Sequence, residues 1–168
     1  MKAAFLDRDG TVIQDMHYCS TPEAVRVLPN AVLGLKMLKD AGFALFIITN
    51  QSGTARGYLS LERLAAVNRR MEQRLGLRFR QIAFCPHHPG ERCGCRKPKP
   101  GMILSLMRRW PEIDPARSIT VGDKITDVIA GIRAGTKTAL IGENKSADPQ
   151  PDLVAKDLLE VALWAKRL

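Results

Sequence analysis

Phe5-Leu6-Asp7-Arg8-Asp9-Gly10-Thr11 follows directly on the apolar pair Ala3-Ala4 and carries two aspartates separated by one residue. The pattern predicts a buried strand over residues 2–7 that ends where a loop begins. Because ligands of open α/β sheets bind outside the carboxyl ends of the strands, we expect Asp7 and Asp9 at a ligand-binding edge. A buried aspartate can act as a nucleophile, a second can serve as general acid and base, and both offer oxygen ligands to Mg²⁺. Taken alone, the same residues fit a turn or a helix cap equally well.

The composition of the 168-residue chain suits a single domain, which we place at residues 1–168. A net charge of +9 fits an anionic partner. The basic residues are scattered, and two Trp and two Tyr provide few stacking platforms, so a small anionic molecule is favoured over nucleic acid. The chain shows no apolar run that could span a membrane and no signal-peptide pattern. We therefore expect a cytoplasmic protein without membrane contact, and a monomer.

Alternating apolar and amphipathic segments predict a doubly wound parallel α/β sheet. We expect strands at residues 2–7, 43–48, 81–84, 119–121 and 138–141, and helices at 29–41, 60–75, 100–110, 126–134 and 153–167. The interval between the first two strands is too short for a large cap domain, so the site should lie open. Each stretch with chemical potential directly follows a strand, which brings all of them to one edge of the sheet.

Two of these stretches suit an anion. Thr49-Asn50-Gln51-Ser52 follows the second strand, and its hydroxyl and backbone N–H groups can hold phosphate oxygens. Arg96-Lys97 follows the loop after the third strand. Lys97 can neutralise a transferring phosphoryl group, and Arg96 can bind a second anionic part of the substrate. Alone, the first is an ordinary polar turn and the second an ordinary solvated pair.

Gly122-Asp123-Lys124 follows the fourth strand, and Asp127 lies one helical turn further on. Asp123 can complete a cation site with Asp7 and the backbone of Asp9. Asp127 either assists there or caps the following helix and interacts with its dipole. Phosphoryl transfer needs a nucleophile, positive charge on the phosphoryl oxygens, and aligned acid and metal groups, and the combined stretches supply each of them.

The order Asp7, Asp9, Thr49, Lys97 and Asp123 resembles the motifs of the haloacid dehalogenase-like phosphatases over nearly the whole chain. The resemblance implies a Rossmann-like core and a phosphomonoester hydrolase with Mg²⁺ as cofactor. It further implies that Asp7 is the nucleophile, that Asp9 is the general acid and base, and that Mg²⁺ is bound by Asp7, Asp9 and Asp123.

The segment Cys85-Pro86-His87-His88-Pro89-Gly90-Glu91-Arg92-Cys93-Gly94-Cys95 predicts a second metal. Cys85, His87, Cys93 and Cys95 form a Cys₃His set, which suits tetrahedral Zn²⁺ in a closed structural site. His88 is an alternative to His87 as the fourth ligand. Zinc would fix Arg96-Lys97, which comes immediately after the last ligand. The remaining thiol, Cys19, is expected to take no part.

This zinc-binding loop resembles the branch that holds heptose bisphosphate phosphatases and histidinol phosphatases. Thr49-Asn50-Gln51-Ser52-Gly53-Thr54-Ala55-Arg56-Gly57 is more similar to the heptose enzymes, and their substrate loop Asp-x-x-Tyr matches Asp15-Met16-His17-Tyr18, although many members have Gly in place of His17. The implied substrate is a phosphorylated sugar, D-glycero-D-manno-heptose 1,7-bisphosphate, a lipopolysaccharide precursor that would lose its 7-phosphate. The expected substrate-binding residues are Asp15, Tyr18, Asn50, Gln51, Ser52, Arg56, Arg96 and Lys124.

Three other functions fit parts of the sequence. A histidinol-phosphate phosphatase shares the short zinc loop. A polynucleotide 3′-phosphatase fits the basic charge and the open site. A zinc-stabilised binding module without catalysis fits the loop but not the complete set of Asp7, Asp9, Lys97 and Asp123.

Overall fold

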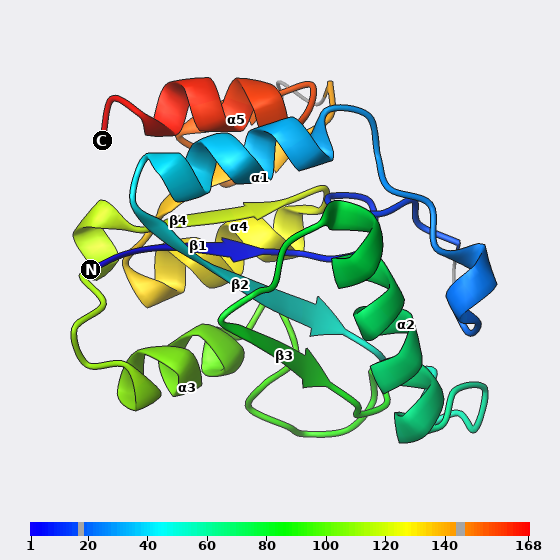
Figure 1. Cartoon of the computed structure of the whole chain (residues 1–168). Helices are drawn as coiled ribbons and strands as arrows, with labels where there is room; N and C mark the ends of the chain where they lie inside the picture. The colour runs from blue at the N-terminus through cyan, green and yellow to red at the C-terminus, as the bar shows by residue number, and fades with distance from the viewer. Residues whose placement is uncertain (17–18, 144–146) are drawn as a thin grey trace.

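A computed structural model describes residues 1–16, 19–143 and 147–168. In these residues the centre is one sheet of six parallel strands in the order β3-β2-β1-β4-β5-β6. Figure 1 shows β3, β2, β1 and β4 side by side in that order. The bounds are Lys2–Leu6 for β1, Phe43–Asn50 for β2, Gln81–Cys85 for β3, Ile119–Gly122 for β4, Lys137–Ile141 for β5 and Leu153–Ala155 for β6. The predicted doubly wound parallel sheet is confirmed.

In the described parts of the chain, five α-helices flank the sheet, and Figure 1 shows helices on both of its faces. They are α1 (Ala31–Asp40), α2 (Leu61–Leu75), α3 (Gly101–Arg109), α4 (Ile125–Ala134) and α5 (Leu158–Ala165), with short 3₁₀ turns η1 at Pro22–Ala24 and η2 at Pro115–Arg117. One apolar core lies between the sheet and α1, α2 and α5, and a second lies between the sheet and α3 and α4. The central strands β1 and β2 are buried on both faces, which explains why their sequences are almost continuously apolar.

The C-terminal segment differs from the sequence prediction. A helix was expected over residues 153–167, but Leu153–Ala155 forms strand β6, which pairs with β5. The helix begins only after Asp157, whose carboxylate accepts hydrogen bonds from the backbone N–H groups of Leu159 and Glu160. Asp152, directly before β6, accepts a hydrogen bond from the backbone N–H of Thr138 in β5. This contact helps to hold residues 153–155 alongside β5 as a strand.

The sheet reverses its direction of growth between β1 and β4, and ligands bind at this point in doubly wound folds. Asp7 directly follows β1, and its backbone N–H donates to Val121 O of β4 at 2.8 Å. Asn50 at the end of β2 lies in register with Cys85 at the end of β3. The topology therefore brings the first aspartates, Thr49, the cysteine loop and Asp123 to one edge of the sheet.

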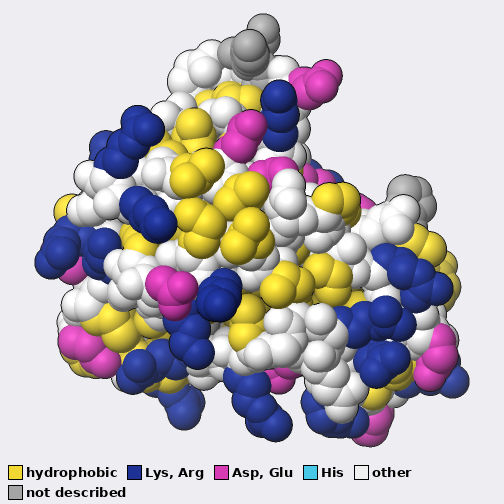
Figure 2. Space-filling model, turned by 45° about the horizontal axis from the view of Figure 1, so that its top comes forward, with side chains coloured by type: hydrophobic (Ala, Val, Ile, Leu, Met, Phe, Trp, Pro, Cys, Tyr) yellow, Lys and Arg dark blue, Asp and Glu magenta, His cyan; other side chains and the backbone are white. Residues whose placement is uncertain are grey.

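Within the described residues, the connections at this edge carry no cap domain. None of the described helices is long and apolar enough to cross a membrane. The net positive charge does not gather into one stripe on the face shown in Figure 2. Its Lys and Arg side chains stand in separate groups with hydrophobic side chains between them. A track for a nucleic acid backbone would need a continuous basic surface, so this face does not favour one.

Candidate active site

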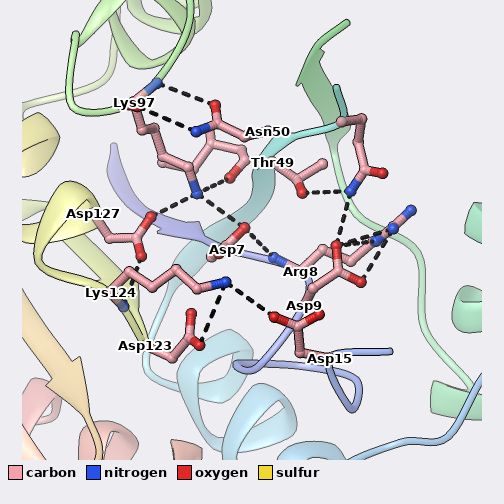
Figure 3. A network of polar contacts seen from close by, with 12 residues as sticks. Asp7, Arg8, Asp9, Asp15, Thr49, Asn50, Lys97, Asp123, Lys124 and Asp127 are labelled. Atoms are coloured by element: carbon pink, nitrogen blue, oxygen red, sulfur yellow. Dashed lines mark hydrogen bonds and ion pairs between the residues drawn. The ribbon is translucent and has the colours of Figure 1, made fainter. Parts of the chain in front are cut away.

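Asp7, Lys97 and Asp127 form the buried centre of the site (Figure 3). Asp7 Oδ1 accepts a hydrogen bond of 2.8 Å from the backbone N–H of Arg8 and an ion pair of 2.9 Å from Lys97 Nζ. Lys97 Nζ also lies 2.6 Å from Asp127 Oδ1 and donates to Ile48 O at 2.8 Å. The ammonium thus has three fixed partners, which hold it beside the carboxylate of Asp7.

The charges of this centre support one another. Burial alone would lower the pKa of Lys97, but the carboxylates of Asp7 and Asp127 outweigh it and raise that pKa. Lys97 therefore stays cationic at neutral pH. For Asp127, burial is the dominant influence and raises the pKa to about 6, although the Lys97 ammonium opposes the rise. A fixed, dry cation beside a carboxylate suits stabilisation of developing negative charge.

Asn50 holds the backbone of Lys97. Its Nδ2 donates to Lys97 O at 3.2 Å, and its Oδ1 accepts from the Lys97 backbone N–H at 3.1 Å. This pair of hydrogen bonds fixes the loop after the third strand to the end of β2. Asn50 was predicted to bind substrate; it lines the cleft, but its side chain is engaged in positioning Lys97.

Three carboxylates form a candidate cation site. One oxygen from each of Asp7, Asp123 and Asp127 lies within 4.8 Å of the other two. Asp123 Oδ1 is buried and has no hydrogen-bond partner among the described residues. Burial raises the pKa of Asp123, although the nearby Lys124 ammonium opposes the rise. All-oxygen ligands with an unsatisfied buried carboxylate fit Mg²⁺.

Asp9 was predicted to bind Mg²⁺ through its backbone, and the structure shows what its side chain contacts. Its side chain turns away from the carboxylate cluster toward Arg8 (Figure 3). Its Oδ2 also accepts a hydrogen bond of 2.8 Å from Gln51 Nε2, which lies 2.9 Å from Thr49 Oγ1 as well. Coordination by the Asp9 backbone carbonyl and the acid–base role of the Asp9 side chain both stay predictions.

These groups open into a cleft of about 370 Å³. Its lining comprises Asp7, Arg8, Asp9, Asp15, Cys19, Thr49, Asn50, Gln51, Arg96, Lys97, Lys124 and Thr126. At its rim, Lys124 Nζ lies 3.0 Å from Asp15 Oδ2 and 3.9 Å from Asp123 Oδ2. Arg96 Nη1 is buried and makes no hydrogen bond within the described part of the chain. Arg96 and Lys97 therefore both lie in the lining of the cleft, and one guanidinium nitrogen of Arg96 has no hydrogen-bond partner among the described residues.

Two predicted substrate-binding residues, Ser52 and Arg56, are not among the lining groups, and a third, Tyr18, lies outside the described residues. Ser52 is buried, and its carbonyl accepts a hydrogen bond from the backbone N–H of Arg56. Arg56 is exposed. The roles of these three residues stay predictions.

The Cys₃His set forms a second, separate cluster. One ligand atom from each of Cys85, His87, Cys93 and Cys95 lies within 4.8 Å of the others. Cys85 Sγ is 3.7 Å from Cys93 Sγ, and His87 Nδ1 is 3.2 Å from Cys95 Sγ. In a tetrahedral site with Zn–S bonds of about 2.3 Å, ligand atoms lie about 3.8 Å apart, so these spacings fit Zn²⁺. His88 is outside the cluster, since its Nδ1 accepts a hydrogen bond from the Gly90 N–H.

The thiols of the cluster differ in pKa, which determines which of them must lose a proton when zinc binds. Burial raises the pKa of Cys85 to about 12. Burial opposes ionisation of Cys93 too, but a backbone hydrogen bond from Arg96 and the neighbouring thiols lower its pKa to about 7. Without metal, Cys85 is therefore a thiol at neutral pH. Metal binding would deprotonate it, as it does for other thiol ligands.

The cysteine loop contacts the segment at 51–57 on one side and helix α3 on the other. Thr54 Oγ1 donates to Gln51 O at 2.6 Å and lies 3.0 Å from Pro86 O. On the other side, a Cβ at Gly101 would lie 2.1 Å from Gly94 O, so α3 packs directly on the loop. The structure of the cysteine loop therefore affects the positions of residues 51–57 as well as those of Arg96 and Lys97.

Comparisons with known proteins agree with this geometry. A family model described as HAD-hydrolase-like matches residues 94–161. D-glycero-beta-D-manno-heptose-1,7-bisphosphate 7-phosphatase of Rhodopseudomonas palustris is 44% identical over 143 residues, which cover 79% of this chain and 79% of the relative. The corresponding protein of Helicobacter pylori is 37% identical over 170 residues, with 98% and 97% covered.

Among solved structures, D,D-heptose 1,7-bisphosphate phosphatase from B. bronchiseptica, complexed with magnesium and phosphate, superposes with a TM-score of 0.90. It is 34% identical, and the match covers 99% of each chain. The fold and the site thus define a haloacid dehalogenase-like hydrolase. Within that class, the chain belongs to the family of the D-glycero-D-manno-heptose-1,7-bisphosphate 7-phosphatases.

The structure adds residues that the sequence analysis did not assign to the site. Asp127 was left between an assisting role and a helix cap; it contacts Lys97, and its Oδ2 also accepts the backbone N–H of Lys124 at the start of α4. Its position four residues after Asp123 was the signal that could have found it. Arg8 and Asn68 had no such signal, because their contact joins residues sixty positions apart.

Gly10→Ala is expected to weaken Mg²⁺ binding. Gly10 has a φ of +81°, and a Cβ there would lie 2.2 Å from Asp123 Oδ2, so the methyl group must displace that carboxylate. Gly76, with a φ of +65° and nothing within 4 Å of the added Cβ, is the matched control for backbone strain alone. Calorimetric titration should show affinity reduced by about tenfold or more in Gly10→Ala. An equal change in Gly76→Ala would contradict the proximity argument.

Proposed function

We propose that this chain is a Mg²⁺-dependent phosphatase that converts D-glycero-D-manno-heptose 1,7-bisphosphate to the 1-phosphate. The observation that carries the proposal is the ion-paired set of Asp7, Lys97 and Asp127 at the topological switch point, with the carboxylate of Asp123 beside it. The comparisons support the proposal, because relatives at 37–44% identity bear the name of heptose bisphosphate phosphatases. We expect the reaction to take place in the cytoplasm.

In the first half-reaction, the free carboxylate oxygen of Asp7 attacks phosphorus and the bond from phosphorus to the sugar oxygen breaks. Asp9 gives its proton to that oxygen, so the sugar leaves as a neutral alcohol. Lys97 and Thr49 hold the phosphoryl oxygens. In the second half-reaction, a water oxygen attacks phosphorus, Asp9 takes the water proton, and Asp7 is released together with inorganic phosphate.

Mg²⁺ would be held by Asp7 and Asp123, with Asp127 next to them. When bound, it would neutralise part of the charge on the phosphoryl group and on the clustered carboxylates. Lys97 is anchored by Asp127 and Ile48 O, so its position does not depend on the substrate. Preorganised positive charge of this kind is the main contribution a protein makes to phosphoryl transfer.

Arg96 accounts for selectivity in this proposal. Its unsatisfied buried Nη1 is suited to a second anionic group, because Lys97 already serves the transferring phosphoryl group. A sugar bisphosphate provides that group. Histidinol phosphate carries a cationic amine at its other end and gains nothing from the guanidinium.

Arg96→Ala is expected to reduce kcat/KM for the heptose bisphosphate by roughly ten- to a hundredfold, because a charge-assisted contact is worth about 1.5–3 kcal/mol. The kcat/KM for histidinol phosphate should change much less, so the difference in kcat/KM between the two substrates becomes smaller. Exposed Arg92 in the same loop provides the control, and Arg92→Ala should leave this difference unchanged. An identical loss on both substrates would remove Arg96 from substrate selection.

A phosphate-release screen tests the proposed function itself. The substrates are sugar bisphosphates, histidinol phosphate, a 3′-phosphorylated oligonucleotide and 4-nitrophenyl phosphate, each with Mg²⁺. We expect the heptose bisphosphate to give the highest kcat/KM. Preference for histidinol phosphate or for the oligonucleotide would reassign the enzyme to that substrate, and inactivity on every ester would leave only a binding module.

A further inference from the structure

Arg8 is the largest fully buried side chain in the described structure, although it carries a permanent positive charge. Arginine is almost never fully buried unless its guanidinium is paired. Here Nε donates to Asp9 Oδ2 at 3.1 Å, Nη2 donates to Asp9 Oδ1 at 3.1 Å, and Nη1 donates to Asn68 Oδ1 at 3.0 Å. The residue between the two aspartates therefore joins Asp9 to a distant helix.

The contact with Asp9 is a two-pronged one. Both carboxylate oxygens face the planar guanidinium, which fixes the orientation of the carboxylate as well as its distance (Figure 3). Gln51 Nε2 adds a third donor to Oδ2. Asp9 thus has a defined side-chain position even though it directly precedes the flexible residue Gly10.

The contact with Asn68 fixes Arg8 in turn. Asn68 lies in the middle of α2, whose buried residues Leu64, Val67 and Met71 pack against the core on either side of it. The helix begins at a Ser60 cap, with the Ser60 side chain accepting the backbone N–H of Arg63. A packed helix, and not a loop, therefore sets the position of the guanidinium.

We propose that Arg8 is a positioning residue that, together with Asn68, aims the carboxyl group of Asp9 at the oxygen of the leaving alcohol. This inference rests on the proposed function, because it takes Asp9 as the general acid and base. Arg8 itself does not contact the reacting atoms in this scheme. Its effect on the reaction passes through the geometry of Asp9 alone.

A positioning role predicts a dependence on the leaving group. An ester whose alcohol leaves easily as an anion needs little proton donation, whereas one with a basic leaving oxygen needs a well-placed acid. 4-Nitrophenyl phosphate and phenyl phosphate differ in this property but share the same ring and charge. A misaimed Asp9 should therefore slow phenyl phosphate much more than 4-nitrophenyl phosphate.

The test compares Asn68→Leu with Asn68→Asp, because leucine removes the acceptor for Arg8 at similar size and aspartate keeps one. For Asn68→Leu we expect kcat/KM to fall by about tenfold or more on phenyl phosphate and by less than about threefold on 4-nitrophenyl phosphate. Asn68→Asp should stay near the wild type on both esters. Arg8→Lys keeps the charge without the fork, and should show the same selective loss in a larger form.

Equal losses on both esters, or no loss in Asn68→Leu, would overturn the inference and leave the sugar assignment untouched. A wild-type preference for a different natural phosphate ester would change the proposed substrate but not this result. A wild-type chain that releases phosphate neither from the heptose bisphosphate nor from either aryl ester would overturn both the proposed function and this inference. Circular dichroism melting identifies a variant that fails to fold, and the Asn68 pair decides the question if Arg8→Lys is such a variant.

Discussion

Asp7→Asn is expected to abolish phosphate release while the protein stays folded. The amide cannot attack phosphorus to form the acyl phosphate, and it weakens the carboxylate cluster with Asp123 and Asp127. Loss of a nucleophile that acts in concert with its neighbours should lower kcat by about 10⁴-fold or more. Phosphate release with Mg²⁺ on the heptose bisphosphate and on 4-nitrophenyl phosphate measures the effect.

The matched control is Asp40→Asn, which makes the same chemical change at an exposed position at the end of α1. It should retain wild-type turnover. Circular dichroism of both variants checks that the secondary structure is kept. Near-normal phosphate release by Asp7→Asn would mean that another group is the nucleophile.

Cys93→Ser is expected to lose zinc and most of its activity. A hydroxyl is a poor substitute for the thiolate in a Cys₃His set, and the ligands Cys93 and Cys95 are only one to four residues from Arg96 and Lys97. Displacement of a reacting group by about 1 Å can cost about a hundredfold in rate, so we expect a loss of that order. Elemental analysis of protein purified without added zinc should find about one zinc per wild-type chain and almost none in the variant.

Cys19→Ser is the control for this experiment. Cys19 is buried in the lining of the cleft, and its thiol donates to Thr21 O at 3.8 Å, away from the cysteine loop. The variant should bind zinc like the wild type. An active, stable wild-type enzyme that contains no zinc would contradict the structural role of the cluster.

The sequence was sufficient to predict most of the fold, because the strands β1 to β5 are short, mostly apolar runs followed by polar residues. The strand β6 was the exception. Leu153-Val154-Ala155 also fits an amphipathic helix, and only its pairing with β5 and the Asp152–Thr138 contact select the strand. Such contacts form in three dimensions and leave no local pattern.

The candidate site, too, could be predicted only in part. The motifs predicted which residues meet at the sheet edge, because parallel strands all end there. They did not predict which side chains would face each other. Asn50 holds the Lys97 backbone, the Asp9 side chain turns toward Arg8, and Asp127 lies in the carboxylate cluster with Asp7 and Asp123. These orientations depend on packing between segments far apart in the chain.

The central claim is that the enzyme removes one particular phosphate from a heptose bisphosphate. Phosphorus NMR of the reaction with D-glycero-D-manno-heptose 1,7-bisphosphate tests it most directly, because the two ester signals and free phosphate are resolved in one spectrum. We predict that the signal of the 7-phosphate disappears as inorganic phosphate grows, while the 1-phosphate signal persists. Loss of the 1-phosphate, or an unchanged bisphosphate under conditions in which histidinol phosphate is hydrolysed, would contradict the account.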